Sequence, residues 1–411
     1  MTASTEPAPG LQPVESHLAS ILAAIRPLEP QRIALEEAEG GVLAEDAAAL
    51  RALPSFDNSA MDGYAVHATD VAGASSEAPV TLPVVGEVPA GDTRTLTLEP
   101  GTTRRIMTGA LLPGGADAVV PVEWTDGNYK NVQIFQPAEA GHAIRRQGDD
   151  VSEGEVLLKP GTRIGPAQLA LLAASGHAAP LARPRPRVAV IATGNELTEP
   201  GVPLLPGQIW DSNSYMLAAC ARQAGAVAVR LLIADEPQVV LATIDKQCEY
   251  VDLLVTSGGI SMGGEHDVVK AALADRGEVT FRKVAMQPGM PQGFGVVGQD
   301  RTPLFTLPGN PVSAFVSFHL YVRPALLALQ GLPPAGLPTV RAALTAPARS
   351  PRGKRSFLRG VLDAHAGTVT PLTGQGSHQL GALGRANALI VVPELVTSLA
   401  AGETADVMPL P

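Results

Sequence analysis

Apolar strand-like runs alternate with helical stretches along the middle of this chain, and this alternation constrains the fold more than any other feature. Runs typical of buried strands occupy 187–193, 226–234 and 251–257, with a helical stretch in each interval. Such alternation is typical of a parallel sheet that is covered by helices. The sequence therefore predicts an α/β domain, to which we assign residues 184–333.

Polar turns follow two of these runs, 187–193 and 251–257, and a further short strand-like run at 303–307. One holds Thr193, Gly194 and Glu196, the second is the glycine-rich run TSGGISMGGEHD at 256–267, and the third is the Pro-Gly-Asn-Pro turn at 308–311. In an open parallel sheet, ligands bind in the crevice at the carboxyl ends of the strands. Backbone N–H groups of a glycine turn can face an anion while nearby acids hold a divalent metal. Glycine-rich turns also serve purely steric needs, so the three turns together, and no single one, predict a phosphate site.

The segments on either side predict a multidomain fold of the α/β plus β class. Apolar residues recur at helical spacing from Val14 to Ile25, and we expect this helix to form one layer with a second helical stretch at 166–174. Short apolar runs among Gly, Pro and Thr, and short alternating segments near the C-terminus, both indicate β structure. The domains expected are a discontinuous helical linking domain (12–52 and 148–183), an inserted β-rich domain (53–147), the central parallel-sheet α/β domain (184–333) and a C-terminal β-barrel (337–411).

Composition argues against several functional classes. The net charge is −10, aromatic residues make up 4%, and Lys and Arg form no block, so electrostatics and stacking disfavour nucleic acid as a partner. Cys220 and Cys248 lack the spacing of a zinc site or a disulfide framework, and we expect small buried residues there. The apolar helix expected at 314–329 contains a His, an Arg and a Pro, which argues against a membrane span. We therefore expect a cytoplasmic protein with no membrane contact.

Seven motifs resemble those of one family, the MoeA enzymes of molybdenum-cofactor biosynthesis (molybdopterin molybdenumtransferases), to which the C-terminal half of gephyrin is related. Their order and spacing match over most of the chain. The motifs are PSFDNSAMDGYAV (54–66), RIMTGALLPGGADAVV (105–120), IRRQGDD (144–150), ATGNEL (192–197), IWDSN (209–213), the SGG turn (257–259) and LPGNPVS (307–313).

The resemblance implies an activity and an assembly. Members of the family are homodimers of four-domain subunits, in which the inserted domain of one subunit faces the α/β crevice of the other. The implied reaction places molybdate on adenylylated molybdopterin and releases AMP, with Mg²⁺ as the cofactor and molybdate and adenylyl-molybdopterin as substrates. Transient contact with other proteins of cofactor synthesis is expected as well.

Five acids are the implied catalytic residues. Glu196, Asp235 and Asp267 would hold Mg²⁺, whose preferred ligands are one or two carboxylates with substrate oxygens. Asp62 and Asp150 would close the site, by resemblance alone. Locally, Asp62 also fits a turn-former, Glu196 an acid at a helix start, and Asp150 part of an ion-pair cluster with the preceding arginines.

A larger set is implied in substrate binding. The N–H groups of the SGG turn and of the helix after Pro311 would hold phosphate and molybdate oxygens, while Asn310 suits the helix cap. Ser377 and His378 resemble a C-terminal motif that approaches the crevice, although a loop histidine is more often a surface residue. The implied substrate-binding residues are Thr108, Thr193, Gly194, Asp211, Asn213, Ser257, Gly258, Gly259, Ser261, Lys283, Pro308, Gly309, Asn310 and Pro311.

Two departures from the family pattern stand out. The acid after the glycine turn comes one residue late, so either Asp267 acts through a bulged loop or Glu265 takes over part of its role. Gln287 and Met290 stand where the family often has lysines, which leaves Lys283 as the basic residue of that segment. A glutamine donates only a neutral hydrogen bond, which is weaker than a charge-assisted one.

Two other functions stay open on the sequence. An ATP-dependent molybdopterin adenylyltransferase would resemble only the α/β domain, and the inserted and C-terminal domains argue against it. A gephyrin-like scaffold or binding protein would share the fold, but the sequence shows no added clustering domain or long linker.

Overall fold

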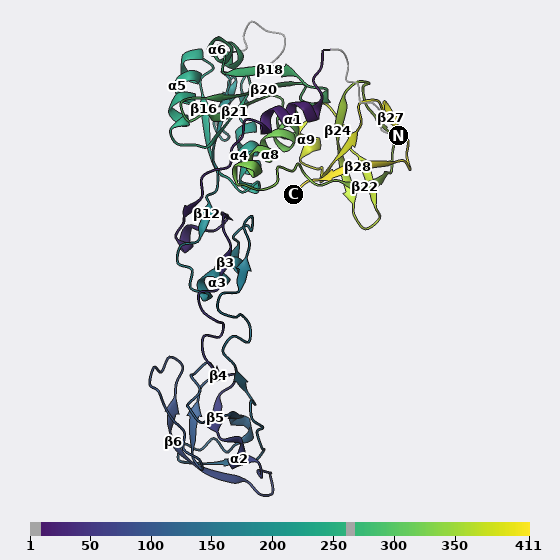
Figure 1. Ribbon diagram of the computed structural model, residues 1–411. Coiled ribbons are helices and arrows are strands. Elements are labelled where there is room, and N and C mark those ends of the chain that lie inside the picture. The colour runs from purple at the N-terminus through teal and green to yellow at the C-terminus, as the bar shows by residue number, and fades with distance from the viewer. Residues whose placement is uncertain (1–9, 260–267) are drawn as a thin grey trace. The chain divides into compact units, whose positions relative to one another are not determined.

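The computed structural model describes residues 10–259 and 268–411, and the chain divides into two compact units (Figure 1). Unit 1 consists of Met1–Gln31, Gly40–Val42 and Arg183–Pro411. Unit 2 consists of Arg32–Glu39 and Leu43–Ala182. Each unit has its own hydrophobic cores, so each is described by itself.

Six of the described strands form the central sheet of unit 1. In spatial order they are β16 (Val227–Ile233), β13 (Arg187–Thr193), β17 (Leu253–Ser257), β21 (Thr302–Leu307), β20 (Pro291–Val297) and β18 (Val279–Lys283). The first four are parallel, β20 runs antiparallel to β21, and the edge strand β18 runs antiparallel to β20. The expected parallel-sheet α/β domain is confirmed.

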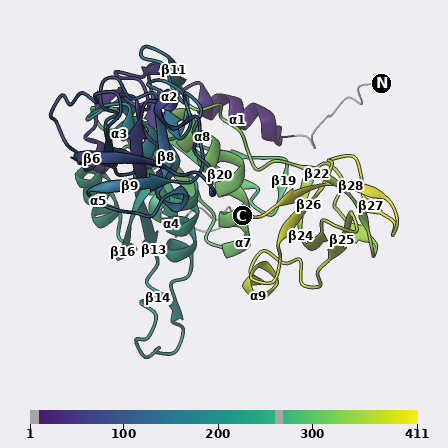
Figure 2. The ribbon, with the colours of Figure 1, turned by 90° about the horizontal axis from the view of Figure 1, so that it is seen from below.

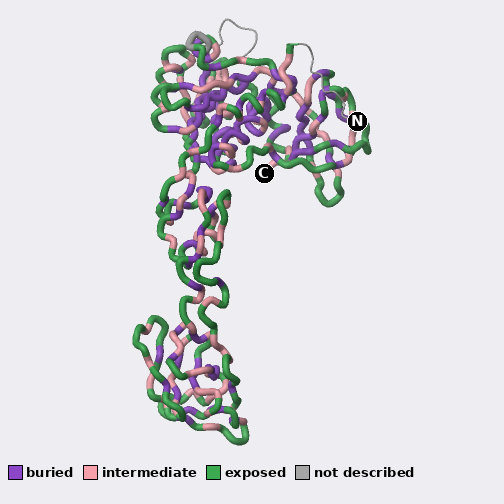
Figure 3. The backbone as a smooth tube through the Cα atoms, viewed as in Figure 1, coloured by how far each residue is buried: buried purple, intermediate pink, exposed green. Residues whose placement is uncertain are grey.

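Helices cover both faces of this sheet because its central strands are apolar on both sides. In β13, Val188 and Val190 pack in one core while Ala189 and Ile191 pack in another, as expected when successive side chains point to opposite faces. The first core contains residues of α4 (Asn213–Gln223), α7 (Pro311–Ser317) and α8 (Arg323–Leu329); the second contains residues of α5 (Pro237–Cys248) and α6 (Val268–Arg276). Figure 3 shows the buried segments gathered in the centre of this domain.

The N-terminal helix packs against this α/β domain. Helix α1 (Val14–Leu22) contacts α8, and the core that contains Val14, Ile21 and Ile25 also contains β13 and β17. Its apolar stripe packs in unit 1, whereas the helix at 166–174, with which it is predicted to form a layer, forms as α3 (Pro166–Ala174) in unit 2. Helical spacing shows that a stripe must be buried, but it does not say against which surface.

A long apolar helix lies in the core of unit 1. Residues Pro311–Leu329 are the one described stretch that is long and apolar enough to cross a membrane, and 72% of the apolar window is buried inside the protein. Pro324 has no N–H for the helical ladder, and the preceding turn, η3 (Phe318–Val322), is a π-helix. This stretch is therefore a core helix.

The C-terminal part of unit 1 is a closed β-barrel. Its strands β24 (Arg355–Asp363), β25 (Thr368–Pro371), β22 (Val340–Leu344), β28 (Thr404–Pro409) and β26 (Ala388–Val392) are neighbours in this order, and β26 also pairs with β24. Closure leaves no free edge. The expected barrel is confirmed. A short strand of the α/β side, β19 (Met286–Gln287), pairs with β24 and joins the two domains.

Unit 2 contains a β-rich domain around the buried Tyr64. Five described strands lie in the order β8 (Ala118–Pro121), β5 (Gly63–Val66), β7 (Thr103–Ile106), β6 (Val80–Val88) and β9 (Asn131–Ile134). The Tyr64 hydroxyl donates to the Asn128 carbonyl at 3.0 Å, which satisfies the one polar group of this core ring. A separate small core includes Leu172 of α3.

Short elements complete the described chain. In unit 2, β3 (Ala47–Ala48) pairs with β11 (Val156–Leu158) and β4 (Asn58–Ser59) with β10 (Ile144–Arg145). In unit 1, β14 (Leu197–Thr198) and β15 (Ile209–Trp210) pair in a loop that projects from the α/β domain (Figure 2). The others are β1 (Gln31–Arg32), η1 (Leu35–Glu37), β2 (Val42–Leu43), α2 (Ala68–Val71), η2 (Val122–Trp124), β12 (Leu181–Arg183), β23 (Ala348–Arg349), α9 (Leu380–Leu383) and β27 (Ser398–Leu399).

Both cysteines lie in the described ranges, and neither forms a disulfide. Cys220 is buried, as expected, and burial raises the pKa of its thiol to about 12. Cys248 is only partly buried.

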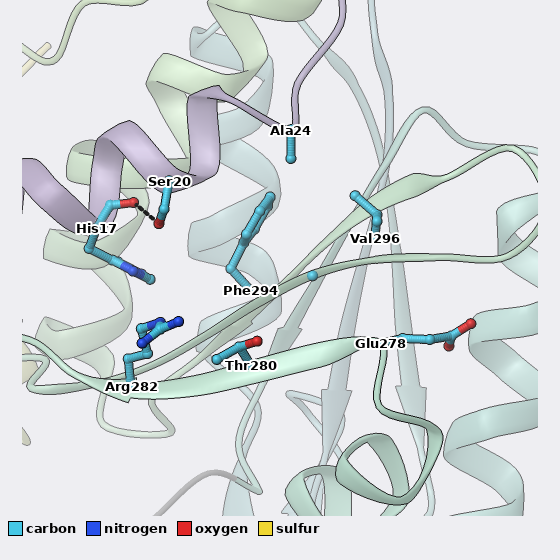
Figure 4. Close-up of a pocket in the computed structure, with 9 residues that line it drawn as sticks. His17, Ser20, Ala24, Glu278, Thr280, Arg282, Phe294 and Val296 are labelled. Atoms are coloured by element: carbon cyan, nitrogen blue, oxygen red, sulfur yellow. Dashed lines mark hydrogen bonds between the residues drawn. The ribbon is translucent and has the colours of Figure 1, made fainter.

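Two described histidines are buried in unit 1 as neutral groups. His17 on α1 and His319 on the core helix are each 2% exposed, and His17 packs edge-on against Tyr321 with 4.8 Å between ring centroids. Burial lowers the pKa of both imidazoles to about 4 because it disfavours their charged form, with smaller contributions from Arg282 and Arg323. Figure 4 shows His17 and Arg282 beside a cavity of about 240 Å³ between α1 and the β18–β20 edge of the sheet.

We expect unit 1 to lose stability as the pH falls from about 6.5 toward 4. The folded pKa of each imidazole, about 4, lies below its ordinary value of 6.5, so the unfolded chain takes up protons first. Between pH 7.5 and pH 5 each histidine should cost about 2 kcal/mol of unfolding free energy. Urea unfolding measures the free energy of unfolding at the two pH values. In His17→Phe the difference between the two free energies should be smaller than in the wild type by about this amount. The control is His365→Asn at an exposed position, where the difference should equal that of the wild type. An unchanged pH dependence in His17→Phe would contradict this explanation.

Candidate functional site

The three polar turns meet in one cleft of about 770 Å³ at the carboxyl ends of β13, β17 and β21. The parallel register explains why, because Ala192 pairs with Ser257 and Ser257 with Leu307, so the three strands end level. The residues of the predicted set that line the cleft are Thr193, Gly194, Glu196, Asp211, Asn213, Asp235, Ser257, Gly258, Gly259, Pro308, Gly309, Asn310 and Pro311.

The glycine turn after β17 needs glycine for two reasons. Gly258 and Gly259 have φ values of 106° and 68°, which side-chain-bearing residues rarely adopt. A Cβ on Gly258 would lie 2.8 Å from the Thr193 carbonyl oxygen, and one on Gly259 would lie 2.6 Å from Val269. The Gly258 N–H donates to the Leu307 carbonyl at 3.2 Å, so this N–H serves the sheet and is not free for an anion.

Asn213 ties two of the turns together. Its Nδ2 donates to Ser257 Oγ at 2.9 Å and to the Gly309 carbonyl at 2.6 Å. Its Oδ1 is buried and has no hydrogen-bond partner among the described residues. The amide therefore holds the glycine turn and the Pro-Gly-Asn-Pro turn at a fixed separation, in the way that buried polar groups usually stabilise a unique arrangement.

Two carboxylates of the predicted metal set face the cleft. Thr193 Oγ1 donates to Asp235 Oδ1 at 2.8 Å, and the Asp235 N–H donates to Asn195 Oδ1 at 3.3 Å. The Glu196 carboxylate lies against Gly194, where an added Cβ would come within 2.4 Å of Oε2. Mg²⁺ usually takes one or two carboxylates and completes its shell with water and substrate oxygens, so this pair fits it. Within the described ranges, no group of three acidic, His or Cys side chains surrounds a common point.

Asp211 belongs to the scaffold of the cleft. Its side chain is 1% exposed, accepts the Ser214 N–H at 3.1 Å and the Ser214 hydroxyl, and pairs with Arg230 at 3.5 Å. Arg230 in turn bonds Glu199 at 3.1 Å and lies 3.2 Å from the centre of the Tyr215 ring. A carboxylate this deep and this fully paired orients α4, and it does not present its charge to the cleft.

One backbone N–H at the start of α7, after the third turn, is already used in a hydrogen bond within the protein. Asn310 is the N-cap and Pro311 the first residue of α7, as expected, but the Asn310 side chain makes no capping hydrogen bond. The Val312 N–H, which we expected to face the substrate, donates to the Ser377 carbonyl at 3.1 Å. The loop of the C-terminal barrel thus binds the start of α7, and His378 and Leu380 line the cleft.

Arg359 anchors that loop, and it was missed in the sequence. Its side chain is fully buried, and Nη2 donates to the Gly374 carbonyl at 2.6 Å and to the Gly376 carbonyl at 3.0 Å. Burial lowers the pKa of the guanidinium. Gln375 completes the contact by bonding the Arg359 backbone at 2.9 Å in both directions. The signal in the sequence was an arginine inside the apolar run SFLRGVL, because such a charge needs internal partners.

Residues 283–290, the segment where two lysines of the family pattern are replaced, lie only partly at the cleft. Met290 lines the cleft, whereas Gln287 and Lys283 are not among its lining residues. Lys283 ends the edge strand β18 and is exposed. Ser261, Glu265 and Asp267 lie outside the described residues.

The remaining predicted residues belong to unit 2. Asp62 Oδ1 accepts the Thr108 N–H at 2.7 Å and the Thr108 hydroxyl at 2.8 Å, so these two residues form a pair. The N–H bond of Thr108, followed by its hydroxyl bond, holds the pKa of Asp62 below its usual value. Asp150 is exposed, and its N–H donates to the Leu53 carbonyl at 3.0 Å. The ion pair of this region joins Arg146 to Asp57 at 2.6 Å.

Models of known families match the chain over nearly its whole length. The MoeA N-terminal region (domain I and II) matches residues 12–176, a probable molybdopterin binding domain matches 189–328, and the MoeA C-terminal region (domain IV) matches 341–410.

Named relatives and a solved structure agree with these matches. The chain is 48% identical over 97% of its length to molybdopterin molybdenumtransferase 2 of Mycobacterium tuberculosis, which is covered completely. It is 37% identical over 92% of its length to the molybdopterin molybdenumtransferase of Bacillus subtilis, of which 90% is covered. A molybdopterin biosynthesis MoeA protein from Pyrococcus horikoshii has a similar structure, with a TM-score of 0.76, 33% identity, and coverage of 97% of this chain and 99% of that one.

We expect Asp211→Asn to destabilise unit 1 by about 2 kcal/mol, because it removes the buried charge that pairs with Arg230 and accepts from Ser214, while Arg230 keeps Glu199 as a partner. The matched control is Asp406→Asn in the exposed pair with Arg341, where the loss should stay below about 1 kcal/mol. Urea unfolding of both variants measures the two costs. Equal losses would mean that the Asp211 charge does not stabilise the scaffold of the cleft.

Proposed function

Because this chain belongs to the MoeA family, we propose that it inserts molybdate into adenylylated molybdopterin and releases AMP. It acts in molybdenum cofactor biosynthesis and is a transferase. The observation that supports the detailed reaction is the cleft of about 770 Å³, whose lining includes a glycine turn, the Glu196 and Asp235 carboxylates and several apolar side chains. Cofactor sites commonly have this volume and this mixture of surfaces.

The alternatives are not favoured. Both relatives compared above are named molybdenumtransferases, and they match this chain over 92% or more of its length. The matched regions also include the inserted and C-terminal domains, which an adenylyltransferase built on the α/β domain alone would lack.

The cleft residues of this chain bind and orient the substrate in the proposed reaction. The Asn213 amide fixes the glycine turn against the Pro-Gly-Asn-Pro turn, so the anionic part of the substrate meets a rigid wall. Thr193 fixes the Asp235 carboxylate. Glu196 and Asp235 would hold Mg²⁺, which neutralises charge on phosphoanhydride oxygens when it is bound. Asp267 is the third proposed ligand and lies outside the described residues.

We expect molybdate-dependent AMP release from adenylyl-molybdopterin to fall about 100-fold or more in Glu196→Gln and in Asp235→Asn. Both substitutions keep the shape of the side chain and remove the charge that would hold Mg²⁺. Glu236→Gln is the control, because this exposed acid follows Asp235 directly but does not line the cleft. Full activity of both cleft variants would contradict the proposed roles, and no AMP release by the wild type would contradict the reaction.

We also propose that the active protein is a homodimer, with Asp62 of one subunit acting at the cleft of the other. The support is that Asp62, Thr108 and Asp150 lie in unit 2 while the cleft belongs to unit 1. In a two-fold dimer such an arrangement would give two identical composite sites. A cytoplasmic location and transient contacts with other cofactor-synthesis proteins stay predictions.

Subunit mixing tests this arrangement. Asp62→Ala and Glu196→Ala should each be inactive alone, but a denatured and refolded equal mixture should regain about a quarter of the wild-type activity, because half of the dimers are mixed and each has one intact site. The measurement is AMP release, after sedimentation has shown the dimer. If mixing restores nothing although mixed dimers form, the two residues act within one subunit.

A further inference from the structure

The lining of the cleft includes apolar side chains and one exposed aromatic ring. Leu197, Ile209 and Trp210 contribute from the paired strands β14 and β15, and Met290 and Leu380 from other segments. Trp210 is the only Phe, Tyr or Trp that lines the cleft within the described residues, and the run at 260–267 contains no aromatic residue. In a chain with only 4% aromatic residues, a half-exposed indole at this position needs an explanation.

The indole is held in place and its polar atom is already satisfied. Nε1–H donates to the Val202 carbonyl at 2.8 Å, and β15, which carries Trp210, pairs with β14. The residue nevertheless remains 50% exposed. A fixed ring with a satisfied N–H offers its face to a ligand at little entropic cost.

The neighbouring aromatic residue is used differently. Tyr215 donates its hydroxyl to Glu199 at 2.9 Å, and the Arg230 guanidinium covers its ring. Its interactions are therefore internal to the scaffold. Among the described residues no cation or aromatic ring covers Trp210 in this way, and the hydrogen bond of its indole N–H lies in the plane of the ring, which leaves the face open.

We propose that Trp210 is a stacking platform for a fused nitrogen heterocycle of the substrate, either the adenine or the pterin. This inference rests on the proposed function and adds the orientation of the substrate. The flat ring would lie on the Trp210 indole, and the anionic part would reach the glycine turn and the Mg²⁺ that Glu196 and Asp235 would hold. Stacking on an aromatic side chain recognises the face that every such heterocycle has.

Fluorescence of the full-length protein tests the proposal directly, because the chain has only two tryptophans. The other, Trp124, lies in unit 2 and stacks on His142. Trp124→Phe makes Trp210 the sole reporter, and Trp210→Phe makes Trp124 the sole reporter. Each variant is titrated with AMP and, separately, with 6-hydroxymethylpterin. At least one of the two compounds should quench the fluorescence of Trp124→Phe saturably, and neither should quench the fluorescence of Trp210→Phe. The compound that quenches identifies the stacked ring, and inorganic phosphate, which has no ring, should leave the fluorescence unchanged.

Steady-state kinetics supply a second readout. In Trp210→Leu the KM for adenylyl-molybdopterin should rise about tenfold with kcat nearly unchanged, because stacking stabilises the bound substrate and its transition state alike. In Trp210→Phe, where a ring remains, the KM should stay close to the wild-type value. Thermal unfolding of both variants checks that they fold.

The outcomes separate the two proposals. An unchanged KM in Trp210→Leu, or no quenching by either ring compound in Trp124→Phe, would overturn the stacking role. If the wild type still releases AMP in the presence of molybdate, the proposed reaction would stand. Absence of molybdate-dependent AMP release by the wild type would overturn the proposed function, and with it the assignment of the stacked ring to this substrate.

Discussion

The parallel register of three strands is the constraint on which the cleft depends. Ala192, Ser257 and Leu307 lie level in neighbouring strands, so the turns that follow them begin at one edge. A slip of one residue would turn the buried side chains of a strand to the other face, so the two cores hold the register. The turns then approach so closely that Gly258 has no room for a Cβ beside the Thr193 carbonyl. The close approach of the turns is therefore a consequence of sheet packing.

Burial divides the acids of the cleft into two kinds. Asp211 lies under the surface with Arg230 and Ser214 as partners, and an unpaired charge at that depth would be costly. Glu196 is exposed and Asp235 half-buried, so both can exchange water for an ion or a substrate oxygen. Residues of one chemical type, adjacent in one cavity, thus serve different purposes because of their access to solvent.

The cleft is completed by a domain that is distant in sequence. The β19–β24 pairing joins the barrel to the α/β domain, and the buried Arg359 holds the turn from which the Ser377 carbonyl binds α7. His378 enters the cleft wall by the same route. The α/β domain thus supplies the acids and the indole of the cleft, and the C-terminal domain supplies His378 and Leu380.

Local patterns in the sequence determined the parallel α/β sheet, the C-terminal barrel and the positions of the three turns. Strand and helix periodicity and turn residues depend on nearest neighbours along the chain, so they are readable without the fold. The partner of α1, the buried role of Asp211, the loss of the Val312 N–H to Ser377 and the exposure of Trp210 were decided only by the tertiary structure. Each of these depends on groups far away in sequence, because burial and hydrogen-bond pairing are properties of neighbours in space.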